Sequence, residues 1–578
     1  MKFDDILTHV GEFGPYQRRM YVLVSVPAIF AAIQAMVPIF LMDIPKHRCA
    51  ISPNDTFHSQ GESHARLVNQ SIPYVKEEGK LTLSSCLLYK TPMNDSGDSN
   101  DTETCSRWVY DTSDIQENVI TEFNVVCDKR ILRAHSNMAA FAGSLVGAFV
   151  MGFVSDHIGR KITFFISVGL QAISAIVTSF SPNIYVFIVI RFVNALSYMS
   201  LFMTAFVFGL EMVGPSKRVL AGVGVQVFWC VGMFILGATA YALRYWKTLQ
   251  LVISVPSVLL FGFWWLIPES PRWLLSRGRK AEAEVIIHKA AKINGVELPA
   301  SMLAELTVDE GDRGKFTQLF TSRVIRNRTL IIFFNWFVVN IAYYGLGLNV
   351  QNLSGDIYLN YTIASIAETA SYVACILLMD RVGRKWLHCS SMLVGGLACV
   401  AVLFPVIYAA PPWVTILLSM IGKLGASAAF AIIYVFSAEL LPTVVRNSGV
   451  GASSTCGKIG GMTAPYIADL GLLIGGDLQV AMPLIVFGVL SMAAGGLSLL
   501  LPETLNTTLP ETIEDAKTFG KSTLRTKYNL TSKSEIADGD VQLNGNVLKR
   551  SAWFLRAQDD KPEMEKCHHT ACLLEQTE

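Results

Sequence analysis

Twelve long apolar runs constrain this chain more than any other feature. Each is about 20 residues long, the length that an α-helix needs to cross the hydrocarbon core of a bilayer. Backbone amides cannot stay unpaired in lipid, so runs of this length and polarity cross as helices. Six lie at 20–42, 135–154, 162–180, 184–209, 219–243 and 248–267, and six at 329–350, 359–379, 387–408, 413–437, 448–470 and 480–501. The sequence predicts an all-α membrane protein with twelve transmembrane helices.

Composition agrees with this assignment. Hydrophobic residues make up 52% of the chain and charged residues only 16%, whereas soluble domains average about 25% charged residues. A net charge of +1 argues against nucleic acid as a partner. The lipid bilayer is therefore the expected surroundings of most of the chain.

The polar segments divide the chain into five parts. A short N-terminal segment (1–19) precedes a six-helix bundle (20–267), which contains a long polar loop (43–134). A charge-rich central loop (268–328) leads to a second six-helix bundle (329–504). The remaining residues, 505–578, are predicted to form a largely disordered tail because they are polar and lack apolar periodicity.

Basic residues in the short loops predict the orientation. They gather on one side of the predicted helices, and Arg244 and Lys247 are the exceptions on the other side. Because cytoplasmic loops are enriched in lysine and arginine, we expect both termini in the cytoplasm and the loop 43–134 outside the cell. The basic residues concerned are Arg18, Arg19, Arg160, Lys161, Lys217, Arg218, Arg381, Arg384, Lys385 and Arg446.

The loop 43–134 carries the features of an extracellular segment. Glycosylation-type triplets begin at Asn54, Asn69, Asn94 and Asn100. Such triplets accept glycans on the secretory side of the membrane, where cysteines also oxidise. Four cysteines therefore predict two disulfides, with three possible pairings that the sequence leaves open. These cysteines are Cys49, Cys86, Cys105 and Cys127.

The two halves of the chain repeat each other. An Asp-x-x-Gly-Arg-Lys turn follows the second helix of each half, an acid and an arginine seven residues apart follow the fourth, and Pro-Glu-Ser or Pro-Glu-Thr ends the sixth. Transporters built from two related bundles show internal repeats of this kind. The repeated segments are Asp156–Lys161 and Asp380–Lys385, Glu211–Arg218 and Glu439–Arg446, and Pro268–Ser270 and Pro502–Thr504.

The repeated charges suggest a gate. Each turn is tight, which its glycine permits, and ion pairs that span two bundles can hold one conformation closed and break in the other. The alternative is that the charges only set topology. Residues assigned to gating or structural support are Asp156, Arg160, Arg191, Glu211, Arg218, Asp380, Arg384, Lys423, Glu439 and Arg446.

Four ionisable residues fall within predicted membrane helices, where each costs about 2.5–3.5 kcal/mol. For Arg191 and Lys423 we favour a structural role, pairing with carbonyls or acids inside each bundle. Glu368 and Lys458 carry opposite charges. They suit a zwitterion, with carboxylate on lysine and ammonium on glutamate. Alternatively, the two neutralise each other in the empty protein.

Several motifs resemble those of one transporter family. Gly152-x-x-x-Asp156-x-x-Gly159-Arg160-Lys161 resembles the loop motif of the major facilitator superfamily, with His157 where arginine is usual and Ile376 at the glycine position of the second copy. Other segments are similar to the organic cation, carnitine and organic anion transporters, and the resemblance covers about residues 1–515. These segments are Trp108–Ser113, Thr121–Cys127, Pro268–Leu274, Tyr343–Gly345 and Ala438–Arg446.

The resemblance implies a central binding cavity. Cation carriers of this family have an acid at the Lys458 position, whereas carnitine and anion carriers have a base, usually arginine. An acid at the Glu368 position is shared by cation and carnitine carriers and by some anion carriers. Aromatic faces in the cavity attract quaternary ammonium groups. The implied substrate-binding residues are Phe202, Gln226, Trp229, Tyr343, Glu368, Tyr434 and Lys458.

These observations favour a plasma-membrane carrier of small organic ions, most of all carnitine- or betaine-like zwitterions or cations, that works by alternating access. An organic anion carrier is the main alternative, because Lys458 is basic. A nucleotide-driven pump lacks its P-loop, since Asp515 stands where the motif needs glycine. An intramembrane enzyme would need a nucleophile–base pair or metal ligands at membrane depth. We expect no cofactor and no metal.

Overall fold

The computed structural model describes residues 3–77, 80–90, 101–299, 316–408, 410–471, 479–507, 509–510 and 512–519. Met1–Phe519 form one compact unit. The predicted tail beyond residue 519 and the predicted glycosylation sites Asn94 and Asn100 lie outside the described residues.

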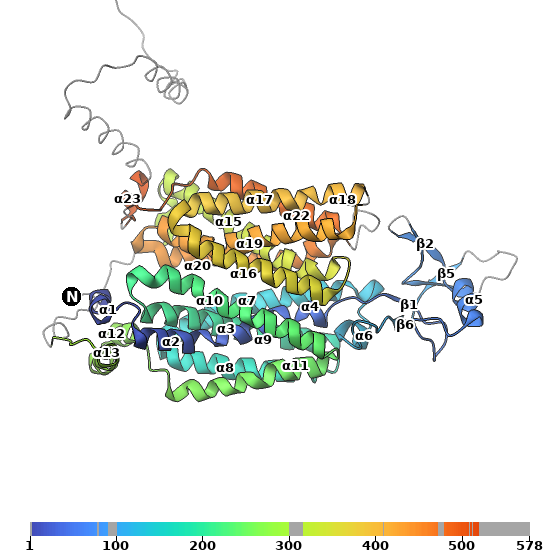
Figure 1. Ribbon diagram of the computed structural model, residues 1–578, viewed down its shortest axis with the longest axis horizontal. Coiled ribbons are helices and arrows are strands. Elements are labelled where there is room, and N and C mark those ends of the chain that lie inside the picture. The colour runs from blue at the N-terminus through green and yellow to red at the C-terminus, as the bar shows by residue number, and fades with distance from the viewer. Residues whose placement is uncertain are drawn as a thin grey trace, which may run out of the picture. The chain divides into compact units, whose positions relative to one another are not determined.

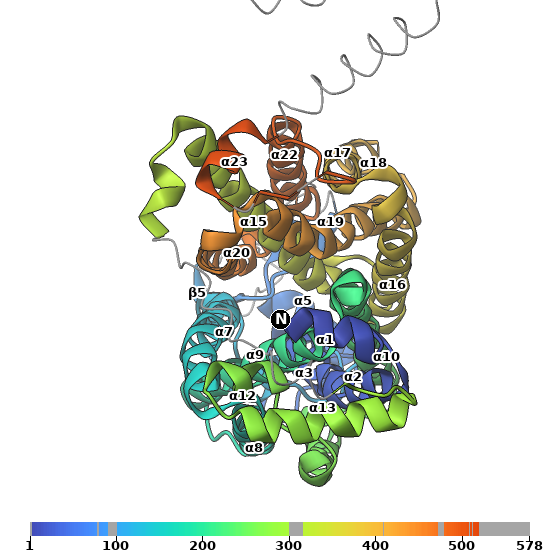
Figure 2. The same ribbon diagram turned by 90° about the vertical axis from the view of Figure 1, so that its left-hand side faces the viewer.

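Helices of the first half form one bundle, grouped in the lower part of Figure 2. Its first crossing, Pro15–Leu41, is made of three consecutive helices because Pro27 and Pro38 interrupt the backbone hydrogen bonds. The sixth crossing ends as a 3-10 helix. The elements are α2 (Pro15–Ser25), α3 (Pro27–Met36), α4 (Pro38–Leu41), α7 (Ile131–Ile158), α8 (Arg160–Thr178), α9 (Ile184–Met212), α10 (Arg218–Ala242), α11 (Trp246–Ser254) and η3 (Val255–Trp265).

Helices of the second half form the other bundle, in the upper part of Figure 2. They follow the same order as in the first half, so the internal repeat of the sequence is also a repeat of structure. The elements are α15 (Arg323–Asn349), η5 (Val350–Asn352), α16 (Ile357–Val382), α17 (Arg384–Ala401), α18 (Leu403–Ile407), α19 (Pro412–Leu440), α20 (Arg446–Ala468) and α22 (Ala481–Ser498).

Within the described ranges, eleven helices are long and apolar enough to cross a membrane. The predicted crossing that is missing from these eleven is the run 448–470, which forms α20; it is less apolar because it is rich in glycine and serine and contains Lys458. Small residues let helices approach closely in membranes, and α20 packs tightly on α15 and α7. A Cβ atom at Gly460 would lie 2.2 Å from the carbonyl oxygen of Phe337. The polarity of α20 thus reflects its place between two helices.

The loop 43–134 contains three two-stranded antiparallel sheets, on the right in Figure 1, which the sequence analysis did not predict. Strands of three or four residues are too short to show an alternating pattern. The pairs are β1 (His47–Cys49) with β6 (Trp108–Tyr110), β2 (Tyr74–Glu77) with β3 (Lys80–Leu83), and β4 (Leu87–Tyr89) with β5 (Thr102–Thr104). The described part of the loop also contains the helical segments α5 (Glu62–Ser71), α6 (Val119–Phe123) and η1 (Cys127–Lys129), which precede α7.

Two disulfides cross-link the described part of this loop. Cys49 pairs with Cys105 and Cys86 with Cys127, which selects one of the three pairings that the sequence left open. The Cα atoms of each pair lie 5.7 Å apart, within the range that a disulfide requires.

We call the helix ends next to this loop the loop face, and the opposite ends, where the Asp156 and Asp380 turns lie, the turn face. Short helices cover the turn face: α1 (Phe3–Val10), η2 (Pro215–Lys217), α12 (Pro271–Ser276), α13 (Lys280–Asn294), η4 (Phe316–Phe320), η6 (Thr443–Val445) and α23 (Ile513–Thr518).

Part of the segment 505–578, which the sequence predicts to be largely disordered, is folded: α23 lies within it. Arg328 donates hydrogen bonds of 2.8 Å to the carbonyl oxygens of Ala516 and Phe519. A basic side chain that satisfies the last carbonyls of a helix stabilises its C-terminus. A tertiary contact therefore orders a segment whose composition alone predicts disorder.

Candidate functional site

A cavity of about 290 Å³ lies between the two bundles. Phe202 and Gln226 line it from the first bundle and Tyr434 from the second. The lining extends to Arg218 and Glu439 at the turn face. Its wall is almost entirely apolar and aromatic, as is typical of ligand sites that accept varied shapes.

The loop face is closed by contacts between the bundles. Arg133 of α7 forms an ion pair of 3.0 Å with Asp469, which follows α20. His135 lies 2.8 Å from the Tyr466 hydroxyl. Nearby, the ring of Phe40 packs against that of Tyr361, with centroids 4.9 Å apart. Because the cavity reaches the turn face while these contacts hold the loop face together, this conformation faces the turn side.

Glu368 of α16 is fully buried, and each of its carboxylate oxygens has a close polar neighbour. Lys423 Nζ lies 2.9 Å from its Oε2 atom, and the hydroxyls of Tyr343 and Tyr372 donate to Oε1 at 2.6 Å and 3.0 Å. The suggested neutralisation of Glu368 by Lys458 is therefore wrong. Lys423 is the partner, because α16 packs directly against α19, which carries it.

Lys458 of α20 has a different environment. Its side chain is buried, its ammonium lies 3.4 Å from the Met199 sulfur, and it sits 5.9 Å from the centre of the Tyr344 ring. Within the part of the chain that the structure describes, no carboxylate lies within ion-pair distance of it. A buried charge without a partner is costly, so Lys458 is a site where an anionic group gains free energy.

Lys458 lies close to the cavity although it does not line it. Met199 is one helical turn from Met203, a cavity residue on the same face of α9. On α20, Val450 lines the cavity and lies two turns from Lys458.

The other predicted binding residues lie behind the cavity wall. Trp229 packs edge-on against Phe202, with ring centroids 5.5 Å apart. Tyr343 stacks on Phe430 at 4.4 Å, and Phe430 in turn contacts the cavity residue Tyr434 at 5.6 Å. This series of aromatic rings links the cavity to Glu368. Phe430 was not singled out from the sequence, since a phenylalanine in an apolar helix carries no signal there.

Arg191 of α9 is another buried cation, in the first bundle. Its guanidinium contacts the Ser136 hydroxyl at 2.8 Å, the Asn137 amide oxygen at 3.2 Å and the Met42 sulfur at 3.0 Å. All of these partners belong to the first bundle and are neutral. They hold α9 against α7 and the end of the first crossing.

The first Asp-x-x-Gly-Arg turn forms an ionic cluster. Arg160 pairs with Asp156 at 2.7 Å and with Glu211 at 3.0 Å. Glu269 accepts hydrogen bonds from the backbone amides of Arg160 and Lys161 at 2.9 Å and 3.1 Å, where a helix N-terminus favours a negative charge. Burial raises the pKa of Glu269 above its usual range.

The second turn repeats this cluster. Arg384 pairs with Asp380 at 3.0 Å and with Glu439 at 3.1 Å. Glu503 accepts from the backbone amides of Arg384 and Lys385 at 2.9 Å and 3.2 Å. The Pro-Glu-Ser and Pro-Glu-Thr repeats are visible in the sequence, but no role was predicted for Glu269 and Glu503. Their matching positions in the two halves were the signal that both accept hydrogen bonds from the first backbone amides of a helix.

The clusters lie within the bundles and do not span them in this conformation. Glu211 pairs with Arg160, whereas Arg218 pairs with Asp4 of the N-terminal helix at 2.6 Å. Glu211 and Arg218, the repeated acid and arginine of the first half, therefore have different partners and do not pair with each other. The six residues between them include the 3-10 helix η2, so Glu211 lies on α9 and Arg218 begins α10.

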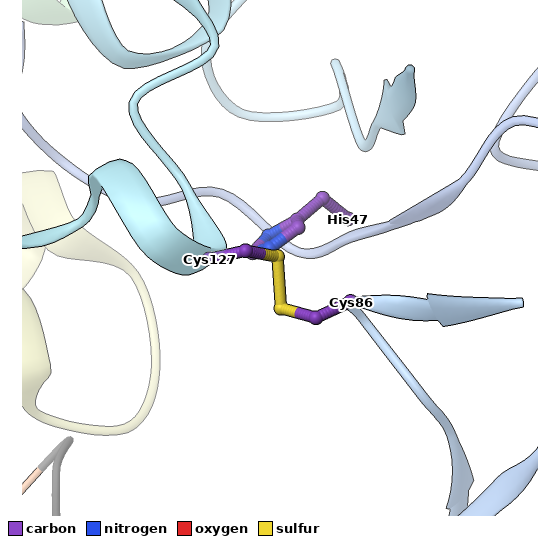
Figure 3. A group of neighbouring side chains, drawn as sticks. All are labelled: His47, Cys86 and Cys127. Atoms are coloured by element: carbon purple, nitrogen blue, oxygen red, sulfur yellow. A yellow bond between two sulfur atoms is a disulfide. The ribbon is translucent and has the colours of Figure 1, made fainter. Parts of the chain in front are cut away.

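His47 lies beside the Cys86–Cys127 disulfide, as Figure 3 shows. The histidine and the two sulfur atoms are close enough to suggest a metal site. Both sulfurs are bonded to each other, however, and a disulfide is not the thiolate ligand that a metal requires. The grouping is therefore structural.

The comparisons with known proteins agree with this architecture. Residues 98–515 match the family model described as sugar (and other) transporter. The organic cation transporter protein of Drosophila melanogaster is 39% identical over 536 residues, which cover 90% of this chain and 95% of the relative. Human organic cation/carnitine transporter 2 is 32% identical over 534 residues, covering 89% and 93%.

A solved structure shares the fold. The proton:xylose symporter XylE, of the major facilitator superfamily, superimposes with a TM-score of 0.59 at 15% identity, covering 86% of this chain and 99% of that one. The predicted all-α fold of two related bundles is thereby confirmed. The protein is a multi-pass membrane transporter and not an enzyme. The chain belongs to the organic cation/carnitine transporter family (solute carrier family 22) of the major facilitator superfamily.

Proposed function

We propose that this transporter carries small organic ions that bear a carboxylate, above all zwitterions of the carnitine or betaine type, by alternating access. The observation that carries the proposal is the buried ammonium of Lys458, which lacks an acidic partner among the described residues. A substrate carboxylate would supply that partner. The cationic end of the same substrate would lie among aromatic rings such as Phe202 and Tyr434.

The state of Glu368 supports zwitterions over simple cations. Its charge is already balanced by Lys423 at 2.9 Å. A solute with only a positive charge would therefore have to displace Lys423 from Glu368, and it would bring no counter-ion for the buried charge of Lys458. A zwitterion has a carboxylate for Lys458 as well. The relatives named for organic cation and carnitine transport are compatible with either substrate class.

Organic anions are the second candidate. A carboxylate without an ammonium group would also neutralise Lys458, and the apolar wall of the cavity suits an aromatic ring. The two candidates differ in whether the cationic end of the substrate contributes to binding.

We further propose that the protein resides in the plasma membrane with the turn face and both termini in the cytoplasm. The basic residues of the short loops support this orientation, as do the disulfides and exposed Asn54 and Asn69 on the loop face. The conformation described above would then face the cytoplasm.

Uptake into expressing cells tests the substrate class. Carnitine, benzoate and tetraethylammonium are compared in the unmodified protein, in Lys458→Gln and in Glu368→Gln. We expect Lys458→Gln to reduce carnitine uptake at least about tenfold, the loss of one charge-assisted contact. If Lys458→Gln leaves carnitine and benzoate uptake unchanged, the charge assignment is wrong. Benzoate uptake without carnitine uptake would favour the anion candidate.

A further inference from the structure

A second and larger cavity lies at the loop face. It has a volume of about 910 Å³ and is enclosed by the disulfide-stapled loop on one side and the ends of α7 and η5 on the other. The ion pair of Arg133 with Asp469 separates it from the cavity at the turn face. We call it the vestibule.

Basic side chains dominate the vestibule wall. The lining includes Lys46, His47, Arg48, His64, Arg130 and Arg133. Asp43 is the one acid among the described lining residues, and burial raises its pKa to about 6 against the pull of the Arg133 guanidinium. Asp55 pairs with Arg48 and His64, and Asp469 pairs with Arg133, so the net positive charge of the wall is smaller than the list of basic residues. A concave surface with a net positive charge concentrates anions.

Two buried groups at the floor of the vestibule have unused hydrogen-bonding capacity. Nε of Arg133 has no hydrogen-bond partner, although the Arg133 side chain is only 2% exposed. The side-chain amide of Gln351, which also lines the vestibule, lacks a partner at both its nitrogen and its oxygen. Buried polar groups are normally satisfied, so these atoms are available to a ligand. A carboxylate accepts from a guanidinium and an amide together.

We propose that the vestibule is a capture site for small organic carboxylates, in which Arg133 and Gln351 bind the carboxylate. Arg133 is also one half of the ion pair that closes the loop face. A carboxylate bound there competes with Asp469 for the same guanidinium and weakens the closure. The solute that is about to be transported thus promotes the opening that admits it. This inference rests on the proposed carboxylate substrate class.

Cysteine protection tests the proposal at the vestibule itself. Ala65→Cys places a thiol in the vestibule wall, on α5. Intact cells are labelled with a membrane-impermeant maleimide in the presence of increasing carnitine, benzoate or tetraethylammonium, with the protein lacking this cysteine as background. We expect carnitine and benzoate to slow labelling and tetraethylammonium to have no effect. Equal protection by tetraethylammonium, or none by either carboxylate, overturns the proposal.

The two halves of the ion pair give matched variants. Arg133→Gln removes the binding group, so the concentration that gives half protection should rise at least about tenfold. Asp469→Asn removes the competitor and leaves Arg133, so that concentration should fall several-fold. If the ion pair were merely structural, both variants would change the concentration that gives half protection in the same direction. That result would refute the carboxylate site. Gln351→Leu, which leaves both charges in place, should weaken protection.

Lys458→Gln separates this proposal from the proposed function. We expect it to leave vestibule protection by carnitine and benzoate unchanged while it reduces their uptake. If Lys458→Gln changes neither the protection of the vestibule cysteine nor uptake, the vestibule proposal is supported and the role assigned to Lys458 is rejected. Protection that is lost together with uptake would mean that the carboxylate binds only at the central site, and the vestibule proposal would fail.

Discussion

Lys423 Nζ lies 2.9 Å from Glu368 Oε2, and both side chains are buried between α16 and α19. The Lys423 ammonium also lies 4.0 Å from the centre of the Tyr343 ring. The pair therefore joins two helices of the second bundle beside the series of aromatic rings that leads to the cavity. It balances a charge at a depth where an isolated acid would be costly.

Removing one member of this pair should destabilise the protein strongly. Lys423→Met leaves Glu368 buried and uncompensated, and breaking a buried pair in this way costs about 3–5 kcal/mol. Lys423→Met with Glu368→Gln should recover most of that loss, because the glutamine still accepts from Tyr343. Thermal unfolding of the purified variants measures both. A double variant no more stable than Lys423→Met would show that the ion pair is not the cause.

Arg218 and Glu439 line the turn-face end of the cavity from opposite bundles. When the turn face closes, we expect the two side chains to approach and pair, which gives each bundle one member of a gate. Arg218→Gln should therefore slow transport about three- to tenfold, the effect of a partly exposed ion pair.

Arg218 also pairs with Asp4, so Asp4→Asn is the matched control. It removes the N-terminal ion pair while leaving Arg218 able to meet Glu439, and it should preserve most of the transport rate. Initial uptake rates, corrected for the amount of protein at the surface, compare the two variants. Equal losses in both would assign the effect to the N-terminal contact.

The fold of the loop 43–134 should depend on acid pH through Asp55. Burial by itself would raise the pKa of Asp55, but hydrogen bonds from Arg48, the Ile51 backbone amide and His64 lower it from 3.8 to about 2. A lowered pKa means that the ionised acid stabilises the folded loop. This contribution is complete above about pH 5 and is lost as the pH falls from about 5 to 1, below both pKa values.

Hydrogen exchange of residues 47–64 measures this effect. Asp55→Asn should increase exchange at pH 5, where the acid is ionised, because it breaks the 2.7 Å contact with Arg48. At pH 2, where about half of Asp55 is protonated in the folded loop, the difference between the variant and the unmodified loop should be much smaller. A difference between them that stays constant from pH 5 to 2 would contradict the role of the Asp55 charge.

Glycine at position 460 should be required for the packing of α20. An added Cβ would lie 2.2 Å from the Phe337 carbonyl oxygen, so Gly460→Ala must separate α20 from α15. Such overpacking typically costs about 1–3 kcal/mol. Gly451→Ala on the same helix meets nothing within 4 Å and serves as control, with unchanged or slightly raised stability. Equal melting temperatures for the two variants would refute this account.

Much of the architecture could be predicted from the sequence because its causes are local. A run of about 20 apolar residues must cross a bilayer as a helix wherever its neighbours lie. The turns at Asp156 and Asp380 and the glutamates at 269 and 503 could be recognised as repeats because each motif is contiguous. The three sheets of the loop escaped prediction, since their strands are too short to show a pattern.

The pairing of the buried charges depended on the tertiary structure. Sequence spacing gives no reason why Glu368 should pair with Lys423 and leave Lys458 without an acid. Helix packing decides this, because an ion pair forms only where two side chains reach each other within about 4 Å. Tertiary structure also decides that Cys49 pairs with Cys105. It likewise brings Arg133 of the first bundle to Asp469 of the second. The sequence by itself determined which segments span the membrane and which charges they carry, whereas only the packed helices decided which of those charges pair with each other.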